Sequence, residues 1–509
     1  WHLVRGDLML EGLMIGAETA LRGVNLVLIA VGCLAGMLIG MLPGLGPISA
    51  IALLIPVSYA LSPESGIMML AGVYYGAIFG GSTSSILLNA PGVAGTVATA
   101  FDGYPMARDG QPGKALAIAA YASFIGGTVG VILLMILAPQ LAQFALAFQS
   151  PEYFMLMVLG LSLVFAFADE GDHLKALAMV LLGLSLATVG TDRASGLPRF
   201  TFGSIELMDG ISFLVLAMGT FAMTEAVYMA ARARSQLEQG PSFGMRSLAL
   251  DRTTTSTMAP AVSRGSFLGF FIGTLPGAGA TMASFLAYGL EKTFPKPNET
   301  AMGRGNARGL AAPEAANNAA CTGSFVPLLT LGIPGSGTTA ILLGAFIAYG
   351  IQPGPQLYIE MPSLFWSVVI SMYIGNLILL FLNLPLIPYI ARILAIPRSL
   401  LAPLILMFSV AGVYLVSFNS SDLFMLAGIT ASALILRWGG YPMAPLLLGF
   451  ILGGLLEDNL RRTLILSDGE LSFFLERPAF IVLSIITLLI ILLPIVRSLL
   501  SRASGTNTP

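Results

Sequence analysis

Long apolar runs alternate with short polar stretches along nearly the whole chain. A run of about 20 mostly apolar residues can cross the hydrocarbon core of a bilayer as a helix. The pattern therefore predicts an all-α, polytopic membrane protein with roughly 12–14 membrane segments. The candidate spans lie near residues 24–42, 66–88, 115–138, 151–168, 174–190, 210–230, 265–290, 313–332, 338–351, 362–390, 401–417, 422–437, 441–456 and 478–498.

A polar segment over residues 231–264 divides the chain into two parts. Lys and Arg gather in cytoplasmic loops, and this segment carries Arg232, Arg234, Arg246, Arg252 and Arg264. We therefore expect a first transmembrane repeat over residues 9–230, a cytoplasmic linker over 231–264 and a second transmembrane repeat over 265–460. Residues 461–509 then form an outer segment, an extra C-terminal transmembrane helix and a cytoplasmic tail.

Two motifs recur in the same order on the two sides of the linker. "GMLIGMLPGLG" at 36–46 matches "GFFIGTLPGAG" at 269–279, with prolines 276 − 43 = 233 positions apart. "GGSTSSILLNAPG" at 80–92 resembles "GSFVPLLTLGIPG" at 323–335, with prolines 334 − 91 = 243 positions apart. These offsets predict an internal duplication. The linker and the tail both carry arginines typical of the cytoplasmic side of the membrane. With both on that side, matching points of the two halves lie on opposite faces of the membrane, which favours inverted repeats.

The composition agrees with a membrane protein and narrows the possible chemistry. Hydrophobic residues make up 56% and charged residues 10% of the 509 positions, whereas a soluble domain carries about 25% charged residues. With two cysteines, Cys33 and Cys321, the sequence predicts neither a disulfide framework nor a paired-cysteine metal site. We expect His173 to lie at a helix end and not to bind a metal, and no cofactor is predicted apart from a coupling ion.

Four Pro-Gly pairs interrupt apolar segments at matching places in the two halves: Pro43-Gly44, Pro91-Gly92, Pro276-Gly277 and Pro334-Gly335. Unpaired backbone groups are costly in hydrocarbon, so an interrupted helix must line a cavity or be enclosed by protein. For any one small residue, close packing between helices is the more frequent explanation. Packing does not require four interruptions in register, however, and matched interruptions indicate a transport site at the interface between the repeats.

Glycine, asparagine and small hydroxyl residues surround these interruptions. Glycine lets the backbone approach a ligand, and a helix that starts at a break directs N–H groups and its positive dipole end at an anion. A phosphate-binding loop is excluded, because Thr338 stands where the Walker lysine is required. The predicted substrate-binding residues are Pro43, Gly44, Gly46, Asn89, Pro91, Gly92, Gly95, Thr96, Pro276, Gly277, Gly279, Asn317, Asn318, Pro334, Gly335, Ser336, Gly337, Thr338 and Thr339. The candidates for binding a coupling ion are Ser82, Thr83, Ser84, Asn317 and Ser324.

The few acidic residues near the spans have structural and functional interpretations. Ser-Pro-Glu or Ala-Pro-Glu is the pattern of a helix start, and we interpret three glutamates as first-turn residues rather than ion-coupling groups: Glu64, Glu152 and Glu314. We expect Asp102, in "FDGYPMARDGQPGKA", to be a solvated turn residue. Glu225 and Glu457 are either boundary residues of their spans or a gate pair.

Six long strings together are specific enough to indicate a family: "GMLPGLGP" (40–47), "YYGAIFGGSTSSILLNAPG" (74–92), "FDGYPMARDGQPGKAL" (101–116), "GTLPGAGA" (273–280), "AAPEAANNAA" (311–320) and "TLGIPGSGTTAILLGAF" (330–346). From about Met9 onward, the chain resembles the large permease subunit of the tripartite tricarboxylate transporters of bacteria. "SSILLN" in the first half is a modest variation on the family pattern and bears on substrate choice.

The resemblance implies a multi-pass secondary transporter of the bacterial inner membrane, and not an enzyme. It implies import of tricarboxylates, dicarboxylates or aromatic carboxylates by symport with Na⁺ or H⁺. Two protein partners are implied, a small membrane subunit and a periplasmic solute-binding protein that delivers the substrate, and no nucleic acid. By analogy with carriers that pair interrupted helices, we expect an elevator-like movement of the loop-bearing helices.

Three other functions compete with this one. An ion channel is expected to carry charged rings or a filter repeat, and an intramembrane hydrolase a Ser–His pair. The sequence favours neither, because the polar loops are mostly neutral and both histidines lie outside them. A carrier for a different small solute stays open, since neutral loops do not by themselves specify a carboxylate.

Overall fold

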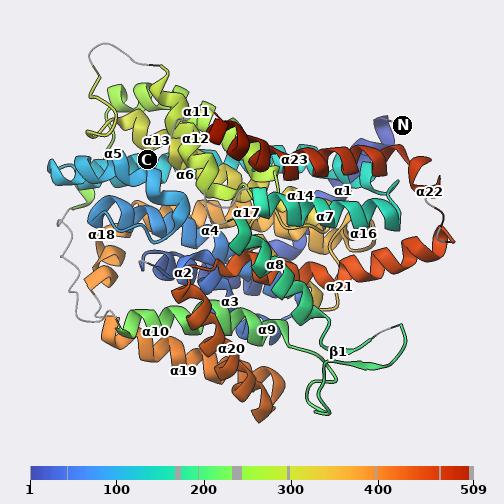
Figure 1. The fold of residues 1–509 in the computed structure, drawn as a ribbon. Coiled ribbons are helices and arrows are strands. Elements are labelled where there is room, and N and C mark those ends of the chain that lie inside the picture. Colours follow the sequence, from blue (N-terminus) through green and yellow to red (C-terminus); the bar gives the residue numbers. More distant parts are fainter. Residues whose placement is uncertain are drawn as a thin grey trace.

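The computed structural model describes residues 2–42, 44–166, 173–192, 194–231, 244–294, 299–395, 398–468, 470 and 472–503. In these ranges the chain is helical except for turns and one antiparallel hairpin, β1 (Gly190–Thr191) with β2 (Pro198–Arg199). Figure 1 shows many of the longer helices running roughly left to right, with the hairpin projecting beyond α8. The prediction of an all-α, polytopic membrane protein is confirmed.

The helices of the first half are α1 (His2–Ala20), α2 (Gly23–Gly40), α3 (Gly46–Tyr59), α4 (Pro63–Leu88), the 3-10 turn η1 (Ala94–Thr96), α5 (Val97–Arg108), α6 (Pro112–Ala145), α7 (Ser150–Ala166), α8 (His173–Ala187), α9 (Phe213–Ala217), the π-helical segment η2 (Met218–Met223) and α10 (Thr224–Ala231). Their starts follow the sequence. Ser62 caps α4 by accepting the N–H of Ser65, and Glu64 lies in the first turn. Glu152 likewise lies in the first turn of α7, so both glutamates are placed as predicted.

The helices that follow are η3 (Met245–Leu248), α11 (Arg252–Thr274), α12 (Gly279–Lys292), α13 (Ala307–Gly323), α14 (Phe325–Leu331), α15 (Gly337–Ala348), α16 (Pro355–Glu360), α17 (Pro362–Asn383), α18 (Ile387–Ile390), η4 (Ala391–Ala395), α19 (Arg398–Ser417), α20 (Ser420–Trp438), α21 (Met443–Leu466), α22 (Ser472–Leu475) and α23 (Pro478–Ala503). Of the predicted linker, residues 232–243 lie outside the described residues, and its last part is the polar beginning of α11.

The two halves pack their first helices in the same way. A Cβ on Gly36 of α2 would lie 2.2 Å from the Val73 carbonyl oxygen of α4, and one on Gly269 of α11 would lie 2.2 Å from the Ala316 oxygen of α13. These partners are 269 − 36 = 233 and 316 − 73 = 243 positions apart, the offsets of the sequence motifs. The same contact repeats one turn earlier and one turn later in both helix pairs, at Gly32, Gly40, Gly265 and Gly273. Glycine is required for so close an approach of two backbones, and the match agrees with an internal duplication.

Several segments differ from the prediction, among them the predicted span 313–332, which comprises most of α13 and the separate helix α14. The predicted span 265–290 is two helices, α11 and α12, separated at the third Pro-Gly pair. The helix α3 was not predicted, because its 14 residues are too few for an apolar span. The helix α5 was expected to be a loop, because its sequence contains Gly103 and Pro105. Short helices of this kind are stabilised by their neighbours rather than by their own composition.

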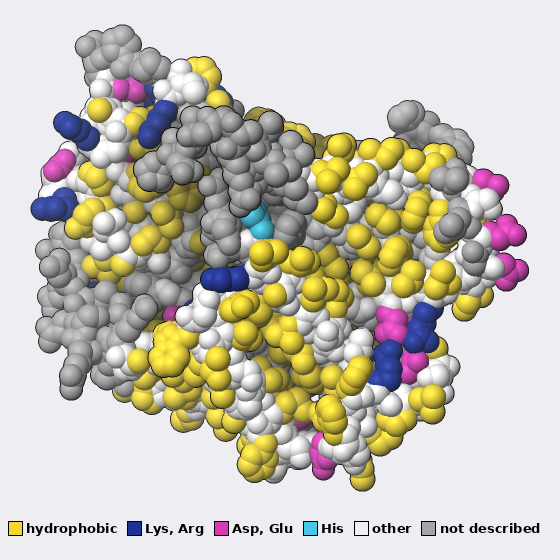
Figure 2. All heavy atoms as spheres, in the orientation of Figure 1, with side chains coloured by type: hydrophobic (Ala, Val, Ile, Leu, Met, Phe, Trp, Pro, Cys, Tyr) yellow, Lys and Arg dark blue, Asp and Glu magenta, His cyan; other side chains and the backbone are white. Residues whose placement is uncertain are grey.

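The surface is that of a protein surrounded by lipid. Among the described residues, seven helices are long and apolar enough to cross a membrane. Large apolar side chains point outward from them, for example Phe424 and Trp438 of α20, which are 80% and 87% exposed. Figure 2 shows a broad hydrophobic area with charged side chains gathered mainly towards its two sides. Because α21 and α23 run from side to side in this orientation, the charges lie near helix ends (Figure 1).

The two ends of α6 identify the two faces of the molecule. At its beginning, Lys114 lies 3.7 Å from Asp251, which belongs to the segment between the halves. Beyond its other end, Arg477 lies 2.7 Å from Glu152. The linker and the segment around residue 477 are therefore at opposite ends of a 34-residue helix, which is about 50 Å long at 1.5 Å per residue. The relative orientation of the two repeats stays a prediction.

Candidate functional site

The first and third interruptions have the same backbone conformation. Gly44 and Gly46 have φ angles of 96° and 64°, and the matched Gly277 and Gly279 have φ angles of 86° and 60°. Glycine alone adopts this left-handed region without a steric penalty, which explains why the motif repeats its glycines at the same spacing in both halves. Pro43 lies outside the described residues. Helices α3 and α12 begin at the second glycine of each pair.

The second and fourth interruptions also match each other. Asn89 ends α4 with a φ of 51°, and Gly332, at the corresponding position, ends α14 with a φ of 70°. Three residues further along the chain, Gly92 faces the end of α2, and Gly335 faces the end of α11. A Cβ on Gly92 would lie 1.9 Å from the Gly40 carbonyl oxygen, and one on Gly335 would lie 3.1 Å from the Gly273 oxygen. The chain therefore folds back onto its own half at each of these points.

Within each half the two interruptions are close to each other, and in the second half a hydrogen bond joins them. The N–H of Gly277 donates to the Gly335 carbonyl oxygen over 3.0 Å. A Cβ on Gly279 would lie 3.8 Å from the Ser336 Cβ, and one on Gly46 would lie 3.9 Å from the Gly92 oxygen. Pro91 and Pro276 are half-buried beside these glycines, whereas Pro334 is buried.

Interruptions of different halves meet in two pairs of helix starts. In the pair α3–α15, a Cβ on Gly337 would lie 3.2 Å from the Ile48 Cδ1. The hydroxyl of Tyr74, on the neighbouring helix α4, is 3.4 Å from that of Ser336. In the pair formed by η1–α5 and α12, a Cβ on Gly95 would lie 3.1 Å from the Ala280 Cβ. The two pairs are equivalent under the duplication. The position that matches Ile48 is next to Ala280, and the position that matches Gly337 is next to Gly95.

The start of α15 offers backbone N–H groups to a ligand. Ser336 and Thr339 form a capping box, in which the N–H of Thr339 donates to Ser336 Oγ over 3.2 Å and that of Ser336 to Thr339 Oγ1 over 2.8 Å. The first-turn N–H groups of Gly337 and Thr338 have no acceptor within the helix. They lie at the positive end of the helix dipole, where an anion is stabilised.

Asn317 and Asn318 lie one turn beyond Glu314 on α13. The Asn317 amide donates to the Gly95 carbonyl oxygen over 3.3 Å, which joins α13 to the interruption of the other half. Asn318 donates to Asn317 Oδ1 over 2.7 Å, and its own Oδ1 is buried without a hydrogen-bond partner among the described residues. Thr96 is buried in η1, where Ser85 donates to its hydroxyl over 2.8 Å.

Glu314 is not at a helix start, so its predicted role is wrong. The helix α13 is capped by Asn306, and Glu314 lies two turns inside it, fully buried. Three hydroxyls from three other helices surround its carboxylate. Ser82 of α4 lies 2.8 Å from Oε2 and 2.9 Å from Oε1, Ser123 of α6 donates to Oε2 over 2.8 Å, and Thr99 of α5 donates to Oε1. The Ala-Pro-Glu pattern misled because proline is also found inside this helix.

Two other candidates for the coupling ion, Ser84 and Ser324, have their contacts elsewhere. Ser84 donates to the Gly81 oxygen and accepts the N–H of Gly92, both over 3.1 Å, so it holds the second interruption in place. Ser324 donates to the Cys321 oxygen over 2.6 Å. Thr83 is buried and lines a small cavity of about 10 Å³, together with Ser82 and Ser123. Of the predicted serines and threonines, the structure therefore places only Ser82 at the acid.

Asp102 is buried in α5, so the expectation of a solvated turn residue is wrong. Its Oδ1 accepts the N–H groups of Gly303, Gly305 and Asn306 over 2.9, 2.9 and 2.7 Å. Asp102 thereby fixes the loop that precedes α13, and its negative charge lies at the positive end of that helix. Sequence patterns missed it because the partners are about 200 positions away, as the 305 − 102 = 203 separation shows.

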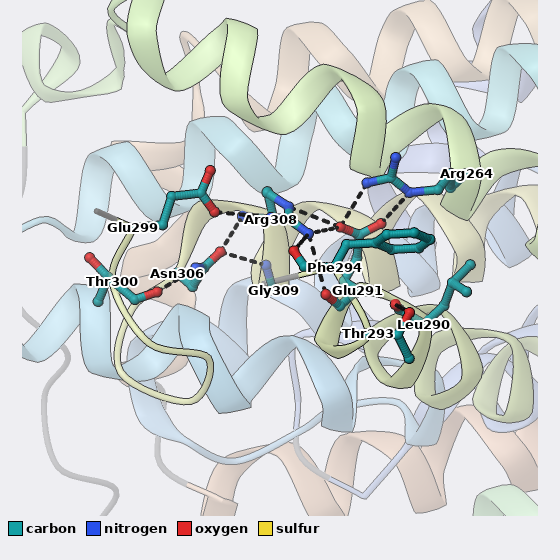
Figure 3. Close-up of polar contacts among 10 residues, drawn as sticks. All are labelled: Arg264, Leu290, Glu291, Thr293, Phe294, Glu299, Thr300, Asn306, Arg308 and Gly309. Carbon is teal, nitrogen blue, oxygen red and sulfur yellow. Dashed lines mark hydrogen bonds and ion pairs between the residues drawn. The ribbon is translucent and has the colours of Figure 1, made fainter. Parts of the chain in front are cut away.

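A buried ion-pair network fixes the opposite side of the same loop. Figure 3 shows the Glu291 carboxylate between the guanidinium groups of Arg264 and Arg308, and both arginine–glutamate contacts are 2.7 Å long. Arg308 also lies 3.1 Å from Glu299, although its side chain is only 1% exposed. The network ties α11, α12 and the beginning of α13 together, so the elements on both sides of the third interruption are held rigidly.

Glu225 and Glu457 do not pair with each other. Glu225 binds Arg437 over 2.9 Å, and a Cβ on Gly44 would lie 2.6 Å from its Oε1. Glu457 binds Arg199 and Arg461, both over 2.7 Å. Each is therefore ion-paired with arginine and not with the other glutamate, and Glu457 lies inside α21 rather than at its end.

A cavity of about 520 Å³ was not predicted from the sequence. It lies between the hairpin, the end of α15 and the middle of α21, and its charged lining residues include Asp192, Arg199 and Glu457. Its volume suits a small organic molecule, but it is next to the end of α15 and not to its first turn. The described residues contain no group of three or more His, Cys, Asp or Glu side chains that could hold a metal ion.

Comparison with known proteins agrees with this architecture. Residues 26–448 match the tripartite tricarboxylate transporter TctA family. An uncharacterized 52.8 kDa protein of the TAR-I ttuC′ 3′ region of Agrobacterium vitis is 46% identical over 495 residues, which cover 96% of this chain and 97% of that protein. An uncharacterized protein of the TAR-II ttuC′ 3′ region of the same organism is 45% identical over 235 residues, 45% of this chain and 96% of that protein. No solved structure matches the chain. The protein is therefore a multi-pass membrane protein that belongs to the TctA family of tripartite tricarboxylate transporters.

Proposed function

We propose that this protein is the large membrane subunit of a secondary transporter that imports carboxylates, driven by a gradient of Na⁺ or H⁺. Its proposed partners are a small membrane subunit and a periplasmic solute-binding protein, and its proposed location is the bacterial inner membrane. Membership in a transporter family supports the general function. The observation that carries the site is the meeting of helix starts from the two halves, at Gly337 with Ile48 and at Gly95 with Ala280.

The carboxylate substrate is assigned to the pair α3–α15. At the start of α15, Gly337 and Thr338 present N–H groups, and Thr338 adds a hydroxyl. Gly44 and Gly46 leave the facing backbone without side chains. Helix dipoles and backbone N–H groups bind an anion without a fixed positive charge, which a carrier that releases its substrate can use more readily than a buried arginine.

The pair formed by η1–α5 and α12 is less suited to an anion. Asn317 joins this pair to α13 through the Gly95 oxygen, and Glu314 lies one turn before it on the same helix. A buried carboxylate repels a second negative charge, and repulsion is stronger where water is excluded. Both pairs have a carboxylate nearby, but the Glu225 carboxylate beside Gly44 is ion-paired with Arg437, whereas none of the ion pairs among the described residues includes Glu314; this difference favours α3–α15 for the substrate.

The test is uptake into proteoliposomes that contain this protein with its membrane subunit and binding protein. A panel of labelled tricarboxylates, dicarboxylates and aromatic carboxylates is offered with a Na⁺ gradient, with a proton gradient and with neither. We expect saturable accumulation of at least one carboxylate that requires both the binding protein and a gradient. A neutral solute accumulated in place of every carboxylate, or a flux that neither saturates nor needs the binding protein, would contradict the proposal and favour a different carrier or a channel.

A further inference from the structure

Glu314 is a fully buried acid outside the helix pair assigned to the substrate. Glu314, Thr99, Ser123 and Ser82 are between 0% and 4% exposed, and the hydroxyls come from three helices of the first half, whereas Glu314 belongs to the second. None of the ion pairs among the described residues includes Glu314.

The other buried acids have compensating groups of a kind that Glu314 lacks. Glu291 and Glu152 each lie 2.7 Å from an arginine nitrogen. Asp102 has three backbone N–H donors and lies at the positive end of α13. Glu314 lies two turns inside the same helix, where the N–H groups of the helix are already bonded within it. Its described hydrogen-bond donors are therefore neutral side chains.

An ionised carboxylate in this position is costly unless a cation neutralises it. Hydroxyl donors satisfy the hydrogen bonds of the two oxygens but do not remove the charge, and taking an unpaired charge out of water is strongly unfavourable. Intramembrane acids without a permanent partner therefore commonly mark ion or proton sites. The charge of Glu314 thus lacks a compensating group that belongs to the described part of the chain.

Packing does not explain why a glutamate stands here. The matched position in the first half is 314 − 243 = 71, which is an alanine, and Ala71 is also fully buried between helices. The same helix pairing is therefore built with a methyl group on one side and with a carboxylate on the other. Only one of the two equivalent positions carries an acid, as expected of a side chain whose function depends on its charge.

The surroundings have the chemistry and the space for a small cation. Ser82 and Ser123 both contact the carboxylate and both line the cavity of about 10 Å³, which is close to the smallest space that holds one water. Hydroxyl oxygens accept from a hydrated proton and coordinate a hard cation. Thr83 lines the same cavity, so the predicted coupling-ion residues Ser82 and Thr83 are both adjacent to it.

We infer that Glu314, with Ser82, Thr99 and Ser123, forms the binding site of the coupling cation, Na⁺ or a proton. The inference rests on the proposed function. A cation bound at Glu314 neutralises its carboxylate. This carboxylate lies on α13 one turn before Asn317, which contacts Gly95 of the other half. Occupancy of the site therefore changes the electrostatic energy of bringing the two halves together, which is how a cation gradient can drive the movement of an anion.

The test replaces Glu314 with the uncharged isostere, Glu314→Gln, in proteoliposomes that contain the partner subunits. Accumulation is measured under a Na⁺ gradient and, separately, under a proton gradient, and exchange of labelled for unlabelled substrate is measured without a gradient. We expect gradient-driven accumulation to fall at least tenfold and exchange to stay within threefold of the wild-type rate. The gradient that drives the wild-type protein identifies the cation. The control, Glu64→Gln in the first turn of α4, is expected to leave both rates unchanged.

A second variant keeps the test decisive if Glu314→Gln does not fold. Ser123→Ala removes one hydroxyl from the carboxylate, and we expect it to raise the cation concentration for half-maximal uptake at least threefold. Its control is Ser371→Ala, because Ser371 is a buried hydroxyl that donates to a carbonyl oxygen of its own helix, α17. An independent readout is the thermal unfolding midpoint of purified protein at constant ionic strength. If the cation is Na⁺, Na⁺ is expected to raise the midpoint of the wild-type protein more than that of Ser123→Ala.

The outcomes separate the two proposals. If the wild-type protein accumulates a carboxylate and Glu314→Gln does so equally, the cation site is wrong and the proposed function stands. The cation site is equally wrong if a folded Glu314→Gln loses exchange and accumulation alike, because the residue then serves substrate passage and not coupling. If the wild-type protein accumulates no carboxylate under any gradient, the proposed function fails and the cation site falls with it.

Discussion

At the residue scale, glycines at the interruptions serve two different purposes. Gly92 is needed for packing, because a Cβ there would lie 1.9 Å from the Gly40 oxygen, which is part of the backbone. Gly337 has more room, since a Cβ would meet only the side chains of Ala444 and Ile48, both at 3.2 Å. The sequence marks both as glycines next to a break and does not distinguish these roles.

Alanine substitutions should therefore separate folding from function. Gly92→Ala forces the second interruption away from α2, and we expect it to lower the free energy of unfolding by about 1–3 kcal/mol, as overpacking does. Gly337→Ala is expected to leave stability within about 1 kcal/mol of wild type but to reduce carboxylate uptake, because its methyl group stands at the start of α15. The measurements are the thermal unfolding midpoint and proteoliposome uptake. Normal uptake by Gly337→Ala would place the substrate away from this helix start.

The acidic residues show how far local sequence reasoning extends. Glu64 and Glu152 were predicted as first-turn residues and are found there, because a serine cap and a proline determine a helix start locally. Glu314 has nearly the same local sequence but lies inside α13, because the earlier cap at Asn306 starts the helix first. The buried position of Asp102 depends on hydrogen-bond partners about 200 positions away, and no local sequence pattern contains them.

At the element scale, the beginning of α13 is positioned from two sides. Asp102 holds the preceding loop through three backbone N–H groups, and Arg308 joins the first turns to Glu291 and Glu299 (Figure 3). Because Glu314 and Asn317 lie further along the same helix, these contacts set the position of the proposed cation site relative to the first half.

The Asp102 contacts can be tested by two substitutions at one position. Asp102→Ala leaves three backbone donors without their acceptor, and we expect the free energy of unfolding to fall by on the order of 3 kcal/mol. Asp102→Asn keeps an acceptor oxygen in place of Oδ1 and is expected to lose clearly less. Thermal unfolding of the purified variants compares them directly. Equal losses for both variants would mean that the charge, and not the hydrogen bonds, holds the loop.

Helix boundaries were predictable where hydropathy determines them and not elsewhere. Long apolar helices such as α4 and α6 appear close to the predicted spans, because burial in lipid or protein selects an apolar sequence over their whole length. The short helices α3, α5 and α12 were missed or merged, since each is about half a span long and depends on contacts with the other helices.

At the scale of the whole molecule, the linker and the segment around Arg477 lie at opposite ends of α6. The hairpin is on the side of α21 that carries Glu457 and Arg461. If the linker is cytoplasmic, as its arginines predict, the hairpin faces the periplasm, where a binding protein would approach.

This sidedness can be measured with single cysteines and a membrane-impermeant thiol reagent. Glu206→Cys, just after the hairpin, is expected to react in intact cells whose outer membrane has been made permeable. Met245→Cys, in the linker and 55% exposed, is expected to react only after the inner membrane is opened. Cys33 and Cys321 are buried, so their background labelling should be low. Reaction of both positions from the same side would refute the predicted topology.

The sequence alone determined the class of the protein, its duplication and the positions of its four interruptions, because these depend on hydropathy, repeated motifs and the backbone freedom of glycine. The tertiary structure decided which interruptions meet, which glycines serve packing, and that one buried glutamate is surrounded by hydroxyls from the other half. The reason is physical. Apolar burial and left-handed turns are properties of a few adjacent residues, whereas the partners of Glu314 and Asp102 come from helices that are brought together only when the two halves pack.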